Sequence, residues 1–184
     1  MSNTKTRDLV LCALFVALIA VGAFIHIPTP LVPVSLQYLC VMLAGLILGG
    51  KLGAAACFIY MMLGLIGVPI FTHGGGPGYV FQPSFGYIIG FVVGAFVIGT
   101  IAYSKNRPSF WRVLVANISG MLTVYIFGMV YYYLMSMFYL NDPIGLWPLF
   151  LHFFLMTIPV DTVYCVLCAV IAKRLIPMLK AGRV

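Results

Sequence analysis

Charge is the scarcest property of this sequence. Charged residues make up 7% of its 184 residues, glutamate is absent, and the acidic residues are Asp8, Asp142 and Asp161 alone. A soluble globular domain carries about 25% charged residues, and disordered chains need low hydrophobicity, whereas 64% of these residues are hydrophobic. The scarcity of charge therefore indicates an integral membrane protein.

Cysteine is also sparse and supplies no disulfide framework. The five cysteines all fall in apolar runs, where a thiol behaves as a small hydrophobic group. Cys165 and Cys168 form a C-x-x-C pair, but no second pair or suitable histidine accompanies them, so we expect helix packing rather than zinc or redox chemistry. His26 and His73 also lack partners at ligand spacing, and we expect no metal site.

What the sequence does contain is long apolar runs that lack the alternation of a membrane β-barrel. Because a spanning helix takes about 20 apolar residues, we expect an all-α integral membrane protein that forms a single membrane-embedded domain over residues 1–184. The first run imitates a secretory signal peptide, but its apolar character continues almost unbroken, so an uncleaved helix is favoured. The six expected transmembrane helices are 9–25, 35–49, 52–68, 84–103, 113–140 and 149–171.

The basic residues predict how these helices are oriented. All ten Lys and Arg residues precede the first span, follow the last, or lie between spans two and three or four and five. The opposite connections, 26–34, 69–83 and 141–148, contain none. By the positive-inside rule both termini are cytoplasmic. The net charge of +7 is then a topology signal, and we expect no nucleic-acid partner.

Two of the outer connections have an unusual composition. Connection 26–34 has three prolines in six positions, and 69–83 has four glycines in five. Proline restricts φ and glycine relaxes it, so these segments are expected to form shaped loops. Connection 69–83 is longer than a turn requires and carries apolar residues such as Phe71 and Tyr79. We therefore expect the loops to fold over an outward-facing ligand pocket.

Asp161 is the most informative single residue. At about 1.5 Å per residue it lies roughly 18 Å from either end of the span 149–171. A charge near the bilayer centre costs about 3 kcal/mol and usually marks a functional site. Pro159 is expected to kink the helix beside it, and Thr157 and Tyr164 share its helix face. A lone acid lacks the second group that acid–base catalysis needs, so a receptor or carrier for a small solute is favoured over an intramembrane enzyme or a passive channel.

Several segments together resemble the BioY family, the biotin-binding S components of energy-coupling factor (ECF) transporters. They are PLVPVSLQ (30–37), GLIGVPIF (64–71) followed by three glycines (74–76), GYIIGF (86–91) and PVD (159–161). The pair Ala13 and Ala17 also resembles the motif with which such components dock on the transmembrane coupling subunit. The resemblance implies six helices, capture of biotin at the outer face of a bacterial or archaeal plasma membrane, and ATP hydrolysis by two separate ATPase subunits. No cofactor is then expected on this chain.

The resemblance also implies a binding site, in which biotin's ureido N–H groups meet an ionised Asp161. Family members carry Lys where this chain has Tyr164, and Gly-Pro-Thr-Gly-Gly where it has residues 82–86. We therefore expect the carboxylate of biotin to be held by backbone N–H groups of residues 74–78, by the start of the fourth helix and by hydroxyl groups. An S component for another vitamin is the alternative. The expected binding residues are Gln37, Phe71, His73, Gly74, Gly75, Gly76, Tyr79, Ser84, Tyr87, Asp161 and Tyr164.

Overall fold

The computed structural model describes residues 2–27, 34–105, 109–139, 145, 147, 150–151 and 157–181. These residues form two two-residue strands, a short 3-10 helix and six α-helices, so the all-helical class predicted from the sequence is confirmed. The five cysteines lie in the helices as free thiols. The elements are α1 (Ser2–Phe24), β1 (His26–Ile27), β2 (Val34–Ser35), α2 (Gln37–Leu48), α3 (Gly50–Ile66), η1 (Pro77–Phe81), α4 (Phe85–Ala102), α5 (Phe110–Phe138) and α7 (Ile158–Ala181).

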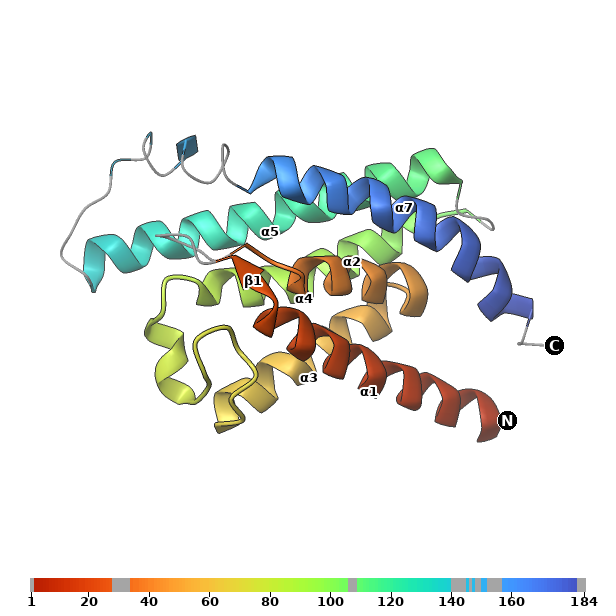
Figure 1. Cartoon of the computed structure of the whole chain (residues 1–184), viewed down its shortest axis with the longest axis horizontal. Coiled ribbons are helices and arrows are strands. Elements are labelled where there is room, and N and C mark those ends of the chain that lie inside the picture. The colour runs from red at the N-terminus through yellow and green to blue at the C-terminus, as the bar shows by residue number, and fades with distance from the viewer. Residues whose placement is uncertain are drawn as a thin grey trace.

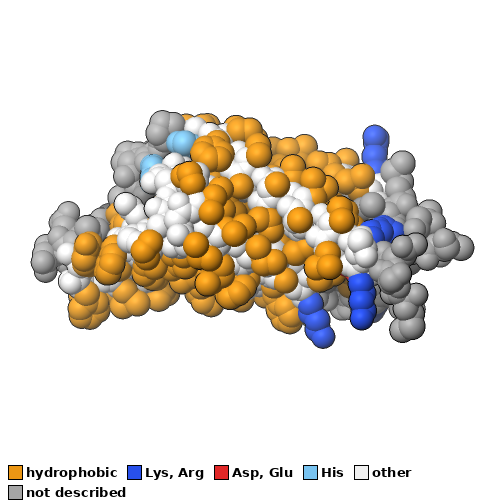
Figure 2. Space-filling model, turned by 90° about the horizontal axis from the view of Figure 1, so that it is seen from below, with side chains coloured by type: hydrophobic (Ala, Val, Ile, Leu, Met, Phe, Trp, Pro, Cys, Tyr) orange, Lys and Arg blue, Asp and Glu red, His pale blue; other side chains and the backbone are white. Residues whose placement is uncertain are grey.

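The helices form an elongated bundle with two different ends (Figure 1). The start of α1 and the end of α7 lie at one end, whereas η1 and the start of α4 lie at the other. Helix α4 packs against α2, α3 and α5, and α7 contacts α5 and α2. Figure 2 shows Lys and Arg side chains at the end that holds the termini, histidines at the opposite end, and a mostly hydrophobic surface between them.

In the part of the chain that the structure describes, three helices contain segments long and apolar enough to cross a membrane: Lys5–Phe24, Phe85–Ala102 and Phe110–Phe138. Helix α2 is apolar but has 12 residues, which cover about 18 Å at 1.5 Å per residue. That length is less than the roughly 30 Å hydrocarbon core of a bilayer. The expected span 35–49 therefore consists of a short helix preceded by the end of a hairpin.

This hairpin joins α1 closely to α2. Strands β1 and β2 pair antiparallel, with His26 opposite Ser35. Just before the hairpin, a Cβ atom built at Gly22 would lie 2.9 Å from the Cα atom of Gln37. The absence of a side chain at Gly22 thus lets the end of α1 touch the first residue of α2.

Glycines also bring α4 against its neighbours. A Cβ atom at Gly99 would lie 2.0 Å from the backbone nitrogen of Gly50, and one at Gly90 would lie 3.0 Å from the Cα atom of Val124. Membrane helices associate through packing because lipid is as apolar as their own side chains. Small residues therefore hold α3, α4 and α5 at short separation.

The helix that carries Asp161 begins later than the sequence predicts. Helix α7 starts at Ile158, so Asp161 lies in its first turn and not about 18 Å from either end of one long helix. Pro159 is the second residue of α7, where the missing N–H removes no intrahelical bond, so it helps to start the helix instead of kinking it. The continuous hydropathy of 149–171 concealed this start. His152 lies outside the described residues.

Candidate functional site

A pocket lies between α2, α4, α5 and α7, beside the loop that joins α3 to α4. The space between its side chains, including the part open to solvent, is about 610 Å³. The lining residues are Ser35, Gln37, Tyr38, Thr72, Tyr79, Ser84, Tyr87, Ile88, Phe91, Val124, Tyr125, Thr157 and Asp161.

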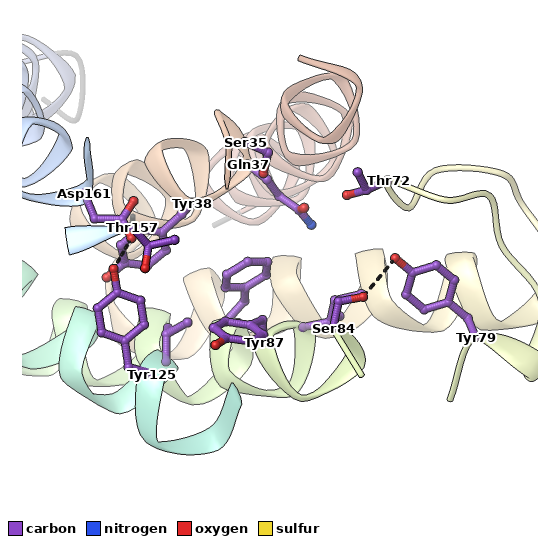
Figure 3. Close-up of a pocket in the computed structure, with 13 residues that line it drawn as sticks. Ser35, Gln37, Tyr38, Thr72, Tyr79, Ser84, Tyr87, Tyr125, Thr157 and Asp161 are labelled. Carbon is purple, nitrogen blue, oxygen red and sulfur yellow. Dashed lines mark hydrogen bonds between the residues drawn. The ribbon is translucent and has the colours of Figure 1, made fainter. Parts of the chain in front are cut away.

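One end of the pocket holds a buried carboxylate. Asp161 is 7% exposed, and the hydroxyl of Tyr125 on α5 donates to its Oδ2 atom at 2.5 Å (Figure 3). The side chains of Tyr38 and Thr157 lie beside it. The Tyr38 hydroxyl is buried and has no hydrogen-bond partner among the described residues. Because a carboxylate has about four acceptor positions, Asp161 can accept further N–H or O–H donors from a ligand.

The opposite end of the pocket holds hydroxyl groups from the α3–α4 connection. Thr72 belongs to the glycine-rich loop, Tyr79 to η1, and Ser84 immediately precedes α4. The hydroxyls of Tyr79 and Ser84 lie 3.5 Å apart, at the far side of Figure 3 from Asp161. Burial raises the pKa of the Tyr79 phenol, which therefore keeps its proton at neutral pH. This end can donate and accept hydrogen bonds without carrying charge.

Gln37, the first residue of α2, points its amide into the pocket (Figure 3). Its side chain is 4% exposed, and its Nε2 atom lies near the Tyr60 hydroxyl but within good hydrogen-bonding geometry of no partner among the described residues. A buried polar group normally has such a partner, because leaving one unsatisfied costs about 1–3 kcal/mol. The amide of Gln37 is thus a donor suited to a ligand acceptor.

The walls between the two ends are apolar and aromatic. Tyr38 on α2 and Phe91 on α4 stack with ring centroids 6.0 Å apart and an interplanar angle of 19°. Tyr87 and Ile88 on α4 and Val124 on α5 complete this part of the lining. A flat or compact apolar body fits such walls.

The glycine-rich loop, residues 69–83, packs beside the pocket. Phe71 is 1% exposed, packs 4.4 Å from Tyr79 between ring centroids, and occupies the space left by Gly64. Gly74 and Gly76 have φ values of 105° and 111°, which L side chains rarely adopt. The Gly74 N–H donates to Phe71 O and the Gly76 N–H to Gly64 O, so these two donors hold the loop together and do not form the expected anion cradle.

Five of the expected binding residues line this pocket: Gln37, Tyr79, Ser84, Tyr87 and Asp161. Phe71, His73, Gly74, Gly75, Gly76 and Tyr164 are not among the lining residues. His73 is exposed, and its ring lies 6.4 Å from that of His26 on the neighbouring hairpin. Tyr164 is half-buried, one helical turn beyond Asp161.

The sequence did not lead us to predict several of the lining residues. Thr157 could have been predicted, because it lies four residues before Asp161 on the same helix face. No sequence pattern indicated Tyr38 or Tyr125, since each lies in a helix that is apolar on every side. Among the described residues, no group of three or more His, Cys, Asp or Glu side chains is placed to hold a metal ion.

Comparison with known proteins gives consistent matches over this fold. A family model described as the BioY family matches residues 1–181. A probable biotin transporter BioY from Lysinibacillus sphaericus is 40% identical over 183 residues, which cover 100% of this chain and 93% of that protein. A biotin transporter BioY from Thermotoga maritima is 40% identical over 123 residues, 66% of this chain and 72% of that one.

The fold has a counterpart among solved structures. The crystal structure at 2.1 Å of the S-component for biotin from an ECF-type ABC transporter matches with a TM-score of 0.78 and 31% sequence identity. The match covers 95% of this chain and 93% of that chain. The likeness in sequence and the likeness in fold therefore extend over nearly the same residues.

Proposed function

Since the chain belongs to the BioY family, we propose that it captures biotin from outside the cell as the substrate-specific S component of an ECF transporter. The observation that carries the proposal is the pocket, with a buried carboxylate at one end, aromatic walls, and neutral polar groups at the other end. Membership of a family of transporter components decides against the intramembrane enzyme that uses Asp161.

Biotin has three parts that suit the three parts of this pocket. Its ureido N–H groups are donors for the Asp161 carboxylate, its bicyclic body is apolar, and its valerate tail ends in a polar group. We place the ureido ring at Asp161, the bicycle between Tyr87 and Phe91, and the tail toward Thr72 and Ser84. A hydrogen bond to a charged group contributes about 1.5–3 kcal/mol, so Asp161 is the main polar anchor in this arrangement.

The distribution of charge supports an orientation in the plasma membrane. Lys and Arg side chains gather at the end that holds both termini (Figure 2), and by the positive-inside rule this end faces the cytoplasm. The α3–α4 connection, which supplies Thr72 and Tyr79 to the pocket, lies at the opposite end. The pocket then receives its ligand from outside the cell.

Transport further requires partner subunits in this proposal. Ala13 and Ala17 are exposed on α1, where small side chains allow another helix to approach closely. We assign this face of α1 to the transmembrane coupling subunit, with two ATPase subunits supplying the energy for release inside the cell.

Calorimetric titration of the purified protein with biotin, thiamine and riboflavin tests the ligand. We expect saturable binding of biotin with a stoichiometry of one, and no binding of the other two vitamins. Binding of thiamine or riboflavin without binding of biotin would assign the chain to a different vitamin.

A further inference from the structure

We propose that this pocket recognises the far end of biotin through uncharged groups, so that the chain binds biotin tail amides as well as it binds the free acid. The proposal rests on the proposed function, because it assumes that biotin occupies the pocket with its ureido ring at Asp161. It adds a class of ligand, the carboxamides of biotin, to the acid itself.

The charge of the pocket comes from one side chain. Among the described lining residues, only Asp161 has a charged side chain, and the others lie in segments 35–38 and 72–91 and at positions 124, 125 and 157. No Lys or Arg occurs anywhere in residues 52–104 or 113–172. All ten basic residues thus fall outside the segments that build this site. A free carboxylate tail consequently adds a second negative charge without gaining a cation.

The groups at the tail end suit an amide at least as well as a carboxylate. Gln37 offers a buried donor that lies near the Tyr60 hydroxyl without a well-formed hydrogen bond to any described residue, and this donor fits the carbonyl oxygen that an acid and an amide share. Thr72, Tyr79 and Ser84 carry hydroxyls, which both donate and accept. They can accept the N–H of an amide tail, whereas a lysine ammonium at this place could only donate.

Electrostatic repulsion by Asp161 also favours an amide tail over a carboxylate tail. Like charges in one low-dielectric pocket disfavour each other, and the tail amide removes one of the two. The amide also keeps the carbonyl and adds two N–H donors for the hydroxyls. We therefore expect biotinamide to bind within about threefold of biotin, or more tightly, a difference below the roughly tenfold that 1.4 kcal/mol represents.

The first test is a competition titration of the purified full chain with biotin and biotinamide. Similar dissociation constants support the inference. If biotin binds and biotinamide binds more than about thirtyfold more weakly, the inference is overturned while the proposed function stands. If biotin itself does not bind, the proposed function fails, so the two failures are distinguishable.

A second test adds a cation at the tail end. In Thr72→Lys, we expect the preference for biotin over biotinamide to rise at least tenfold, because the ammonium meets the carboxylate and gains nothing from the amide. Gln82→Lys is the matched control, since Gln82 is exposed and lies two residues before Ser84 outside the lining. If Thr72→Lys does not yield folded protein, Ser84→Lys takes its place. An unchanged preference in a folded variant overturns the inference.

Discussion

Tyr125 and Asp161 come from different helices and meet in one hydrogen bond. The phenol on α5 donates to the carboxylate on α7 at 2.5 Å, and the carboxylate lies in the first turn of its own helix. Donors and a helix N-terminus both interact favourably with negative charge. Two neighbouring elements thus compensate for the burial of Asp161 and fix the direction in which it faces the pocket.

Replacing the carboxylate tests its role as the polar anchor. We expect Asp161→Asn to weaken biotin binding by about 1.5–3 kcal/mol, or roughly 10- to 150-fold, because a hydrogen bond to a charged acceptor is lost. Calorimetric titration measures the change. Asp8→Asn, at the start of α1, is the control and should leave the affinity unchanged. A folded Asp161→Asn protein with unaltered affinity would remove Asp161 from the site.

A substitution can separate the role of the Tyr125 hydroxyl, which positions Asp161, from the role of the Tyr125 ring. Tyr125→Phe keeps the aromatic wall but removes the donor to Asp161, and we expect a loss of about 0.5–1.5 kcal/mol in biotin binding, or roughly 2- to 12-fold. Tyr133→Phe on the same helix, outside the pocket lining, should have no effect. Equal affinities for the two variants would show that the hydrogen bond does not contribute to binding.

Residues of the site were predictable where polarity broke an apolar run. Asp161 is such a case, and the resemblance to BioY added Gln37, Tyr79, Ser84 and Tyr87, which all line the pocket. Tyr125 and Tyr133 show which residues could not be predicted from the sequence. Both are tyrosines of α5, yet one faces the pocket and the other does not, and a helix that is apolar on every side gives no periodic signal to distinguish them.

At the scale of elements, close approach between helices depends on glycine. We expect Gly99→Ala to lower the free energy of unfolding by about 1–3 kcal/mol, because its Cβ atom would meet the Gly50 backbone at 2.0 Å. That loss corresponds to a decrease of about 2–12 °C in Tm for a chain of this size. Thermal unfolding in detergent measures it.

The matched control for this substitution is Gly78→Ala. A Cβ atom at Gly78 meets nothing within 4 Å, and its φ is not in the left-handed region. We expect its Tm to equal that of the unaltered protein. If Gly99→Ala unfolded at the same temperature as Gly78→Ala, the contact between α3 and α4 would not limit stability.

Hydropathy located the helices better than it located their ends. The apolar runs predicted the positions of α3, α4 and α5 to within a few residues, because lipid-facing helices are uniformly apolar. The same uniformity hid the start of α7 at Ile158, because the apolar character of 149–171 continues past Thr157 and Pro159, although both are residue types that often begin a helix. The expected second span also began too early, at Ser35, which is the last residue of β2 and lies before the start of α2.

At the scale of the whole molecule, the basic end and the end that carries the histidines are separated by the hydrophobic middle of the bundle (Figure 2). Binding and uptake should therefore be separable by mutation. We expect Ala17→Trp to reduce biotin uptake at least tenfold in cells that contain the coupling and ATPase subunits, because a large side chain blocks helix–helix approach. Binding by the purified variant should be unchanged.

The control for uptake is Ile126→Trp, a substitution at an exposed position of α5. Uptake should be unaffected if α1 alone supplies the docking face. Loss of uptake in both variants, measured with labelled biotin at equal protein levels, would assign docking to a broader surface. Loss of binding in Ala17→Trp would show instead that the substitution disturbs the pocket.

The contact between Gly22 and Gln37 links the proposed docking helix to the pocket mechanically. The end of α1 and the start of α2 are in direct contact here, because a Cβ atom at Gly22 would lie only 2.9 Å from the backbone of Gln37. The end of α1 therefore rests on the backbone of a residue whose side chain lines the pocket. If the proposed partner tilts α1, we expect the backbone of Gln37 to move with it, so that docking and the position of one pocket donor would be coupled.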